Sequence, residues 1–385
     1  MRTRQIRNIV AVTSVVLLAT GCAGAEAPAP TTSDEAATAA QECSGSIGIM
    51  APITGPAATI GGEQLNFAKL AVDNFNKKNN STYKLVEGDT QLDPGQASTV
   101  AQQLLSNSDV LAVVGPAGSQ EVEAVGKGFG DADLAFISAS ATRTDLTSGA
   151  YPTYFRVIPN DSVQGPTGAE FAVNKLDAKK VVIFEEKTSY GKGLADAFES
   201  ALKDKGVEVT RVPVSQKQVD YSAVVSKVAE DVDVVFATFQ IAANTKVLGE
   251  QLKAKGKKAI VFASDGSFSP DFDVPGSYVS AFAPDIKGIA SSNELAKQFE
   301  DKYGEFGTYG PPVHAATQVA LEAMQRACEA GTTSRAAVLD QVKKTDIPES
   351  ILGGPITFTD QGDVKDAKFY VFKVSEKGVL ELADQ

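Results

Sequence analysis

Hydroxyl side chains that directly follow short apolar runs are the clearest chemical signal in the sequence. Ser119 follows the run at 110–114 and a turn of Gly, Pro and Ala residues, and it directly precedes a helical stretch. A second group follows the apolar run that ends at residue 137 and comprises Ser138, Ser140 and Thr142. Hydroxyls and backbone N–H groups at two adjacent strand ends form an anion site that suits a carboxylate. For either segment alone, a helix cap or a turn explains the same residues.

Residues that could carry catalysis or hold a metal ion are scarce. The single histidine, His314, excludes a histidine-rich metal site and repeated acid or base use. Neither a G-x-S-x-G sequence nor a P-loop occurs, and the glycine-rich segment at 126–131 lacks the last glycine of a dinucleotide fingerprint. We therefore expect a protein that is not an enzyme and that uses no cofactor or metal. His314 could line a pocket, although a lone histidine more often packs in the interior or faces solvent.

The N-terminus has the pattern of an export signal. Three arginines precede a mainly apolar run at 9–19, which is too short to anchor the chain across a membrane. Residues 1–21 are therefore predicted to be a signal peptide. The run ends in Leu18-Ala19-Thr20-Gly21-Cys22, which resembles a bacterial lipobox with Ala19 where leucine is usual, and this implies lipidation of Cys22. The alternative is a cysteine that follows an ordinary cleavage site.

Composition separates this N-terminal part from the rest of the chain. Residues 23–41 are almost only Ala, Pro, Thr, Ser, Glu and Asp, so 22–43 is predicted to be a flexible linker on the lipid anchor. The whole chain has 385 residues, of which 43% are hydrophobic, enough for two ordinary domains after the linker. Its net charge of −12 argues against nucleic acid as a partner.

The sequence contains three cysteines, two of which could form a disulfide. If Cys22 carries a lipid, Cys43 and Cys328 remain for each other in an oxidising exterior, and we predict a disulfide between them. Two buried thiols are the alternative, which only geometry can decide.

Short apolar, β-rich runs alternate with amphipathic helical stretches along most of the chain. The predicted strands of the first half lie at 47–50, 85–87, 110–114, 134–137 and 154–158. Those of the second half lie at 181–184, 207–214, 232–239, 260–263, 278–283, 356–358 and 369–374. Strands that are apolar on both faces need helices on each side of a parallel sheet. The sequence thus predicts an α/β fold with two doubly wound lobes, and a ligand site beyond the carboxyl ends of their strands.

A family resemblance covers nearly the whole chain after the linker. It is carried by 51–56 (APITGP), 114–119 (VGPAGS), 137–142 (ISASAT), 164–166 (QGP), 190–194 (YGKGL), 353–356 (GGPI) and 360–363 (DQGD). Their order and spacing resemble those of the leucine/isoleucine/valine-binding proteins, the substrate-binding lipoproteins of branched-chain amino acid ABC transporters. The resemblance implies the type I periplasmic binding protein fold, with mainly parallel sheets in two lobes joined by three hinge crossings. Lobe 1 would comprise 44–158 and 285–353, and lobe 2 would comprise 159–284 and 354–385.

The resemblance also implies roles for individual residues. Ser119, the backbone near Ser140 and the Thr142 hydroxyl match the positions that grip the ligand α-carboxylate. Asp265 stands where the family places a glutamate against the α-ammonium, although it could equally be a turn residue before glycine. Tyr190 matches an aromatic residue that closes over the ligand, or it simply packs at the start of its helix.

Other positions depart from the family pattern. Ile60 stands where an aromatic residue is frequent, and Gln240 and Ile241 replace a pair of tyrosines. The pocket for the ligand side chain is therefore altered. Together with His314, the polar Gln240 would suit another amino acid, an amide or a urea-like compound.

The implied function is extracytoplasmic capture of a small solute. A monomeric protein, held on the outer face of the cell membrane only by its lipid, would bind an amino acid or an analogue by hinge closure. It would then deliver the ligand to an ABC transporter permease. An amide, urea or small-carboxylate binding protein and a ligand-sensing receptor of the same fold are the alternatives.

Overall fold

The computed structural model describes residues 43–383 of the chain. The predicted signal peptide, the lipidation at Cys22 and nearly all of the linker lie outside these residues. Within them, no helix is long and apolar enough to cross a membrane. The same part of the chain holds no cluster of His, Cys, Asp or Glu side chains that could bind a metal ion.

The first sheet is parallel throughout and has the strand order β2-β1-β3-β4-β5. Its strands are β1 (Ser44–Ala51), β2 (Thr82–Asp89), β3 (Val110–Val114), β4 (Ala135–Ser138) and β5 (Tyr154–Arg156). The helices that pack on it are α1 (Ala58–Asn79), α2 (Pro94–Ser106), α3 (Ser119–Asp131), α9 (Gly310–Glu329) and α10 (Arg335–Val342). Strand β3 is buried along its whole length, as its apolar sequence predicts.

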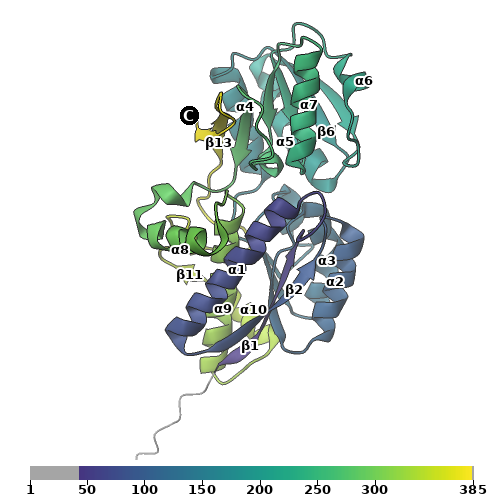
Figure 1. The fold of residues 1–385 in the computed structure, drawn as a ribbon. Coiled ribbons are helices and arrows are strands. Elements are labelled where there is room, and N and C mark those ends of the chain that lie inside the picture. The colour runs from purple at the N-terminus through teal and green to yellow at the C-terminus, as the bar shows by residue number, and fades with distance from the viewer. Residues whose placement is uncertain (1–42, 384–385) are drawn as a thin grey trace, which may run out of the picture. The chain divides into compact units, whose positions relative to one another are not determined.

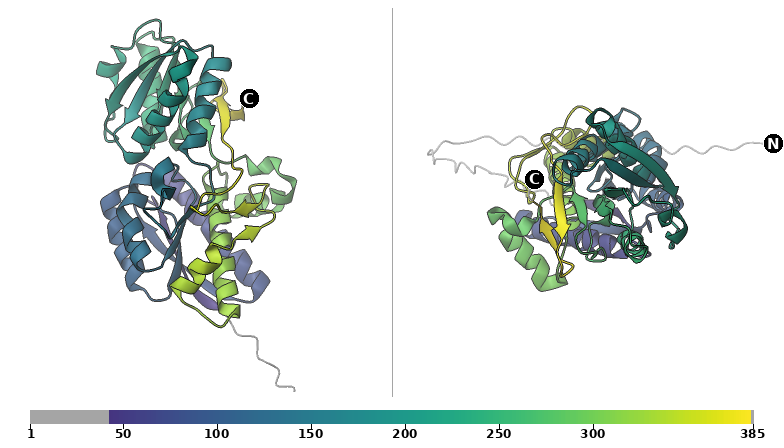
Figure 2. Two further views of the ribbon diagram at one scale, coloured as in Figure 1. Left: turned by 180° about the vertical axis from the view of Figure 1, so that it is seen from behind. Right: turned by 90° about the horizontal axis from the view of Figure 1, so that it is seen from above.

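Helices cover both faces of this sheet, and alternate residues of each strand face opposite layers. Val113 packs with the apolar side chains of α2 and α3, such as Leu104 and Phe129. Its neighbour Val114 packs with those of α1 and α9, such as Leu65. The two layers lie on either side of the strands in Figures 1 and 2. This arrangement is the doubly wound lobe that the sequence predicts.

The second sheet has the strand order β14-β13-β10-β9-β8-β6-β7. Its strands are β6 (Lys180–Glu186), β7 (Glu208–Val214), β8 (Val234–Ala237), β9 (Ile260–Ala263), β10 (Tyr278–Ala281), β13 (Tyr370–Val374) and β14 (Leu380–Leu382). Only the pairs β10–β13 and β13–β14 are antiparallel. The helices of this lobe are α4 (Asp161–Asn174), α5 (Ser189–Leu202), α6 (Ser222–Val225) and α7 (Ala242–Ala254).

Three passages of the chain join the two sheets, as the fold prediction requires. The chain leaves the first sheet after β5, returns after β10 to form α9 and α10, and reaches β13 in a last passage. Between them lie α8 (Asn293–Tyr303) and the small sheet of β11 (Asp346–Ile347) and β12 (Ile356–Thr357). Short 3-10 helices are η1 (Thr144–Thr147), η2 (Lys203–Lys205), η3 (Asp265–Ser267), η4 (Ile286–Gly288) and η5 (Ala290–Ser292). The residue numbers given above for the lobe boundaries stay predictions.

Cys43 and Cys328 form a disulfide in the structure, with their Cα atoms 5.9 Å apart. The bond joins the residue just before β1 to the last turn of α9, across a sequence separation of 285 residues. It ties the start of the described chain to a helix that packs on the same sheet. A cross-link over so long a loop restricts the unfolded chain strongly.

We expect the double variant Cys43→Ser with Cys328→Ser to lower the free energy of unfolding by about 2–5 kcal/mol. Urea unfolding of the oxidised protein measures this loss. Dithiothreitol should lower the melting temperature of the parent protein and leave that of the double variant unchanged. An equal response of both proteins to the reductant would contradict a structural role for the bond.

Candidate functional site

A small cavity of about 20 Å³ lies where residues beyond the carboxyl ends of strands from both sheets meet. Five of the residues predicted to bind ligand line it, namely Ile60, Ser140, Tyr190, Gln240 and Asp265. Residues that were not predicted complete the lining, and they are Pro52, Ala57, Leu92, Ala117, Gly266 and Tyr309. The cavity has room for about one water molecule. An amino acid therefore enters only if the surrounding side chains or lobes move.

Asp265 stands at the start of η3, directly after strand β9, and only 2% of it is exposed. Its Oδ1 atom accepts hydrogen bonds from the Tyr190 hydroxyl and from Gln164 Nε2, each at 2.6 Å. Its backbone oxygen accepts a hydrogen bond of 3.0 Å from the Tyr309 hydroxyl. The next residue must be small, because a Cβ atom on Gly266 would lie 2.4 Å from the carbonyl oxygen of Phe239. The carboxyl group is thus held in one position.

A second buried carboxyl, that of Asp161, lies close enough to Asp265 to be affected by its charge. Burial, together with the charge of Asp265, raises the pKa of Asp161 to about 8. Burial also raises the pKa of Asp265 to about 6, although hydrogen bonds from Tyr190 and Gln164 favour its ionised form. A cationic group placed between the two buried carboxyls would stabilise the ionised form of each.

The hydroxyls predicted to grip a carboxylate have different surroundings. Ser119 Oγ accepts a hydrogen bond of 3.3 Å from the backbone N–H of Arg143. Ser140 Oγ donates to the carbonyl of Ala117 at 3.0 Å and accepts from Gln64 Nε2 at 3.1 Å. Both hydroxyls therefore hydrogen-bond to the backbone of loop residues, as residues of a helix cap or a turn commonly do.

Thr142 differs from the two serines. Its Oγ1 atom is buried and, among residues 43–383, completes no hydrogen bond of ordinary geometry, although it lies close enough to the Asp161 carboxyl to favour the ionised form of that acid. A buried hydroxyl without a partner is costly, so a ligand oxygen that accepts its hydrogen bond would be favoured there. Thr142 is fully buried and is not among the residues that line the small cavity, so a ligand would reach its hydroxyl only after the surrounding groups move.

His314 is not brought to this cavity. It lies on α9 in a different depression, together with Phe75 and Leu321. Burial lowers the pKa of His314 to about 4, so its imidazole is neutral. Tyr309, at the N-cap of the same helix, is the residue that reaches the cavity. His314 is five residues after Tyr309, and five residues of an α-helix rotate the side-chain direction by about 140°. His314 therefore faces another side of the helix.

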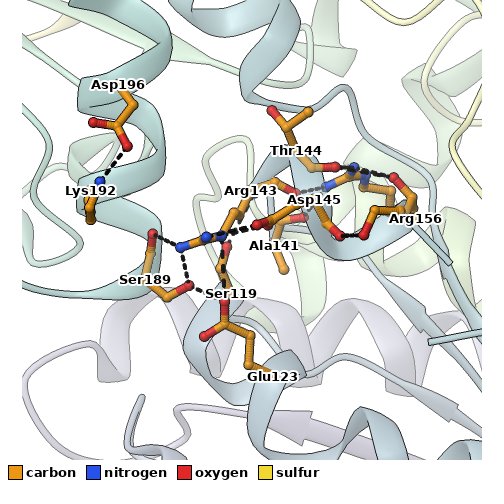
Figure 3. A network of polar contacts seen from close by, with 12 residues as sticks. Ser119, Glu123, Ala141, Arg143, Thr144, Asp145, Arg156, Ser189, Lys192 and Asp196 are labelled. Carbon is orange, nitrogen blue, oxygen red and sulfur yellow. Dashed lines mark hydrogen bonds and ion pairs between the residues drawn. The ribbon is translucent and has the colours of Figure 1, made fainter. Parts of the chain in front are cut away.

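Arg156, at the end of β5, organises the loop that bears Thr142. Its guanidinium is fully buried and donates to the carbonyl oxygens of Ala141, Arg143 and Thr144 at 3.2, 2.7 and 3.3 Å. It also donates to the Thr147 hydroxyl at 3.0 Å and to the Asp363 carboxylate. Figure 3 shows the loop wrapped around this guanidinium. The backbone of Arg156 also pairs with the third crossing, through Gly362 and Val364.

Arg143 extends from the same loop to the second lobe. Its Nη1 atom donates to the backbone oxygen and to the hydroxyl of Ser189, at 3.1 and 2.9 Å. The Ser189 hydroxyl in turn donates to Glu123 on α3 at 2.5 Å. These contacts, visible in Figure 3, link residues of the first lobe to the first residue of α5.

Two α/β lobes that meet at a small cavity beyond the carboxyl ends of their strands are the architecture of a solute-binding protein. The family model described as periplasmic binding protein matches residues 45–379. The chain therefore belongs to the periplasmic binding protein family, whose members described below are binding proteins and not enzymes. Its resemblance to that family, argued above from short motifs, is confirmed.

Two relatives show the extent of this similarity. The Leu/Ile/Val-binding protein BraC3 of Rhizobium johnstonii is 28% identical over 338 residues, which cover 85% of this chain and 90% of BraC3. The leucine-, isoleucine-, valine-, threonine- and alanine-binding protein of Pseudomonas aeruginosa is 27% identical, over 85% of this chain and 89% of its own.

Solved structures share the fold. The leucine-binding protein LivK of Thermotoga maritima has a TM-score of 0.80 and 22% identity, over 88% of this chain and 97% of its own. LivJ of Streptococcus pneumoniae, solved in complex with isoleucine, has a TM-score of 0.79 and 23% identity, over 89% of this chain and all of its own. The type I fold is thus confirmed.

Several residues of the site were missed by the sequence analysis. Asp161 and Gln164 belong to the segment whose Gln-Gly-Pro triplet carried part of the resemblance, yet neither was given a role. Tyr309 and Arg156 lie far along the chain from the hydroxyl motifs. Asp161 follows the buried strand β5 after a short turn. A polar residue soon after a buried strand is the signal that could have identified this acid.

Replacing Arg156 with Met should lower the free energy of unfolding by about 3–5 kcal/mol, because Asp363 and the loop carbonyls lose a buried charged partner. Urea unfolding measures the change. Lys127→Met is the matched control, since its ion pair with Asp131 is solvent-exposed and its loss should have no measurable effect. Equal stability of the two variants would contradict the role assigned to Arg156.

Proposed function

We propose that the chain is an exported, lipid-anchored solute-binding protein that captures an amino acid or an amino-acid-like molecule by hinge closure. It would deliver this ligand to an ABC import permease. The family supports capture of a solute, and the names of the relatives support amino acids as the ligand class. The observation that carries the proposal is the pair of buried acids, Asp161 and Asp265, beside the buried hydroxyl of Thr142.

The two ends of an α-amino acid fit these groups. Its carboxylate would accept a hydrogen bond from Thr142 and lie near the N-terminus of α3, where Ser119 begins the helix and the helix dipole favours an anion. Its ammonium would lie against Asp265, with Asp161 nearby. Hydrogen bonds to charged groups contribute about 1.5–3 kcal/mol each, which is enough to select α-amino acids over neutral analogues.

Closure follows from the distribution of these contacts over the lobes. Thr142 and Ser119 belong to the elements of the first sheet, whereas Asp265 and Tyr190 belong to those of the second. A ligand that touches both sets binds the closed form more tightly than the open form and shifts the population towards it. The closed form would be the one that a permease recognises.

The anchoring part of the proposal rests on the N-terminal sequence. A lipid on Cys22 and the linker that follows it would hold a monomeric binding protein at the outer face of the cell membrane. Such a tether leaves the lobes free to meet a permease. Metabolic labelling with a palmitate analogue would detect the lipid, and a Cys22→Ala variant should lose the label and be released from the membrane fraction.

Affinity for an amino acid should depend on pH through Asp265. The ammonium needs the ionised carboxylate, and the pKa of Asp265 without ligand is about 6, so protonation competes with binding as the pH falls through 6. We expect the affinity to fall by about tenfold for each pH unit well below 6. Titration calorimetry between pH 4.5 and 7.5 measures it, starting from a thermal-shift screen of the amino acids.

Matched ligands and variants make this experiment decisive. An α-keto acid lacks the ammonium of the corresponding amino acid and should bind at least tenfold more weakly. The variant Asp265→Asn should bind the amino acid more weakly and lose the pH dependence, whereas the exposed Asp231→Asn should behave like the parent protein. Equal binding of keto and amino acids, or unchanged affinity in Asp265→Asn, would contradict the proposed ammonium site.

A further inference from the structure

Three glutamines from separate elements meet beside the cavity. Gln120 lies in the first turn of α3, Gln216 follows β7, and Gln240 follows β8. The Oε1 atom of Gln240 accepts hydrogen bonds from Gln120 Nε2 at 3.0 Å and from Gln216 Nε2 at 3.1 Å. Gln240 is only 7% exposed and lines the cavity together with Asp265.

These hydrogen bonds fix the orientation of the amides and leave two groups unused. Because both donors point to Oε1 of Gln240, its Nε2 group is directed elsewhere and has no acceptor in the part of the chain described here. The Oε1 atom of Gln120 is buried and has no donor among the same residues. The cluster therefore has one donor and one acceptor to spare, and burial makes the acceptor, Oε1 of Gln120, costly to leave unpaired.

We propose that this glutamine cluster, Gln120, Gln216 and Gln240, is the subsite for the far end of the ligand and selects a carboxamide or urea group there. The carbonyl oxygen of such a group accepts a hydrogen bond from Gln240 Nε2, and its NH₂ donates to Gln120 Oε1. This inference rests on the proposed function, since it assumes that the other end of the ligand is an amino acid held near Asp265.

Other groups fit the cluster less well. An aliphatic side chain leaves the spare donor and the spare acceptor unpaired. A carboxylate would face Gln120 Oε1 and lie near the buried acid Glu186, whose Oε1 is already bonded by Gln216 at 3.3 Å and by the Thr188 hydroxyl at 3.4 Å. An ammonium group has no hydrogen-bond acceptor to offer Gln240 Nε2. Only an uncharged group that both donates and accepts satisfies the two glutamines.

The cluster also has space on its outer side. Gln120 and Gln216 line a second cavity of about 870 Å³, which shares Ala57 and Leu92 with the small one. The hydrogen bond between Gln120 and Gln240 joins side chains from the two lobes. Gln120 lines the larger cavity and Gln240 lines the small one, so a ligand amide that bonds to the spare groups of both lies at the boundary of the two cavities, and the small inner volume does not exclude it.

Near-isosteric amino acids test the subsite by titration calorimetry with the full-length protein lacking only its signal peptide. Asparagine should bind at least tenfold more tightly than leucine and than aspartate, and glutamine should similarly exceed methionine and glutamate. The variant Gln240→Leu should abolish this preference for carboxamides. Gln218→Leu is the matched control, because Gln218 is only partly buried and its side-chain amide bonds to the backbone of Asp220, away from the cluster; it should keep the preference.

Gln120→Met provides an independent variant on the first lobe if Gln240→Leu does not fold. It should reduce the preference for asparagine over aspartate, because the ligand NH₂ loses its acceptor. Leucine that binds as tightly as asparagine overturns the carboxamide subsite and leaves the proposed amino-acid function intact. Failure of every amino acid to bind the parent protein overturns both.

Discussion

The buried guanidinium of Arg156 is the constraint on which the site depends. A guanidinium remains charged at any physiological pH, and a buried charge without partners is strongly unfavourable. Arg156 satisfies its donors with the carbonyls of the loop at 141–147 and with Asp363 of the last crossing. If any of these partners moved away alone, the buried guanidinium would lose a hydrogen-bond partner. The loop that bears Thr142 and two of the three passages between the sheets are therefore held as one structural unit.

The polar groups of the cavity bond to one another, and these bonds hold them in position. Tyr190 and Gln164 hold Asp265, and Gln120 holds Gln240. Such preorganisation limits the conformational entropy that binding would cost. Ligand affinity then depends on the difference between the hydrogen bonds that the ligand makes and those that the protein makes without it. Both form in a water-poor space, where electrostatic interactions are stronger than in bulk solvent. Selectivity follows from which ligand leaves no buried donor or acceptor unpaired.

Much of the fold could be predicted from the order of apolar runs. Strands such as β3 and β9 are apolar on both faces and are recognisable without any tertiary information. Helix α4 was missed because Gly165 and Pro166 interrupt its helical spacing, although its buried face packs against α5. The edge strand β14 was missed as well, because its three residues, Leu-Glu-Leu, are too few to show an alternating pattern.

The sequence by itself determined the two-sheet α/β fold, the family and five of the residues that line the cavity, because strand ends and short motifs are local features. Only the tertiary structure decided which side chains share the site. It placed His314 in a different depression and brought Tyr309 and Asp161 close to Asp265. It also joined Gln120 to Gln240 by a hydrogen bond. These outcomes depend on helix rotation and on contacts between distant segments. Of the hydroxyls after two neighbouring strands, Ser119 and Ser140 thus hydrogen-bond to loop backbone, whereas Thr142 lies buried beside the Asp161 carboxyl.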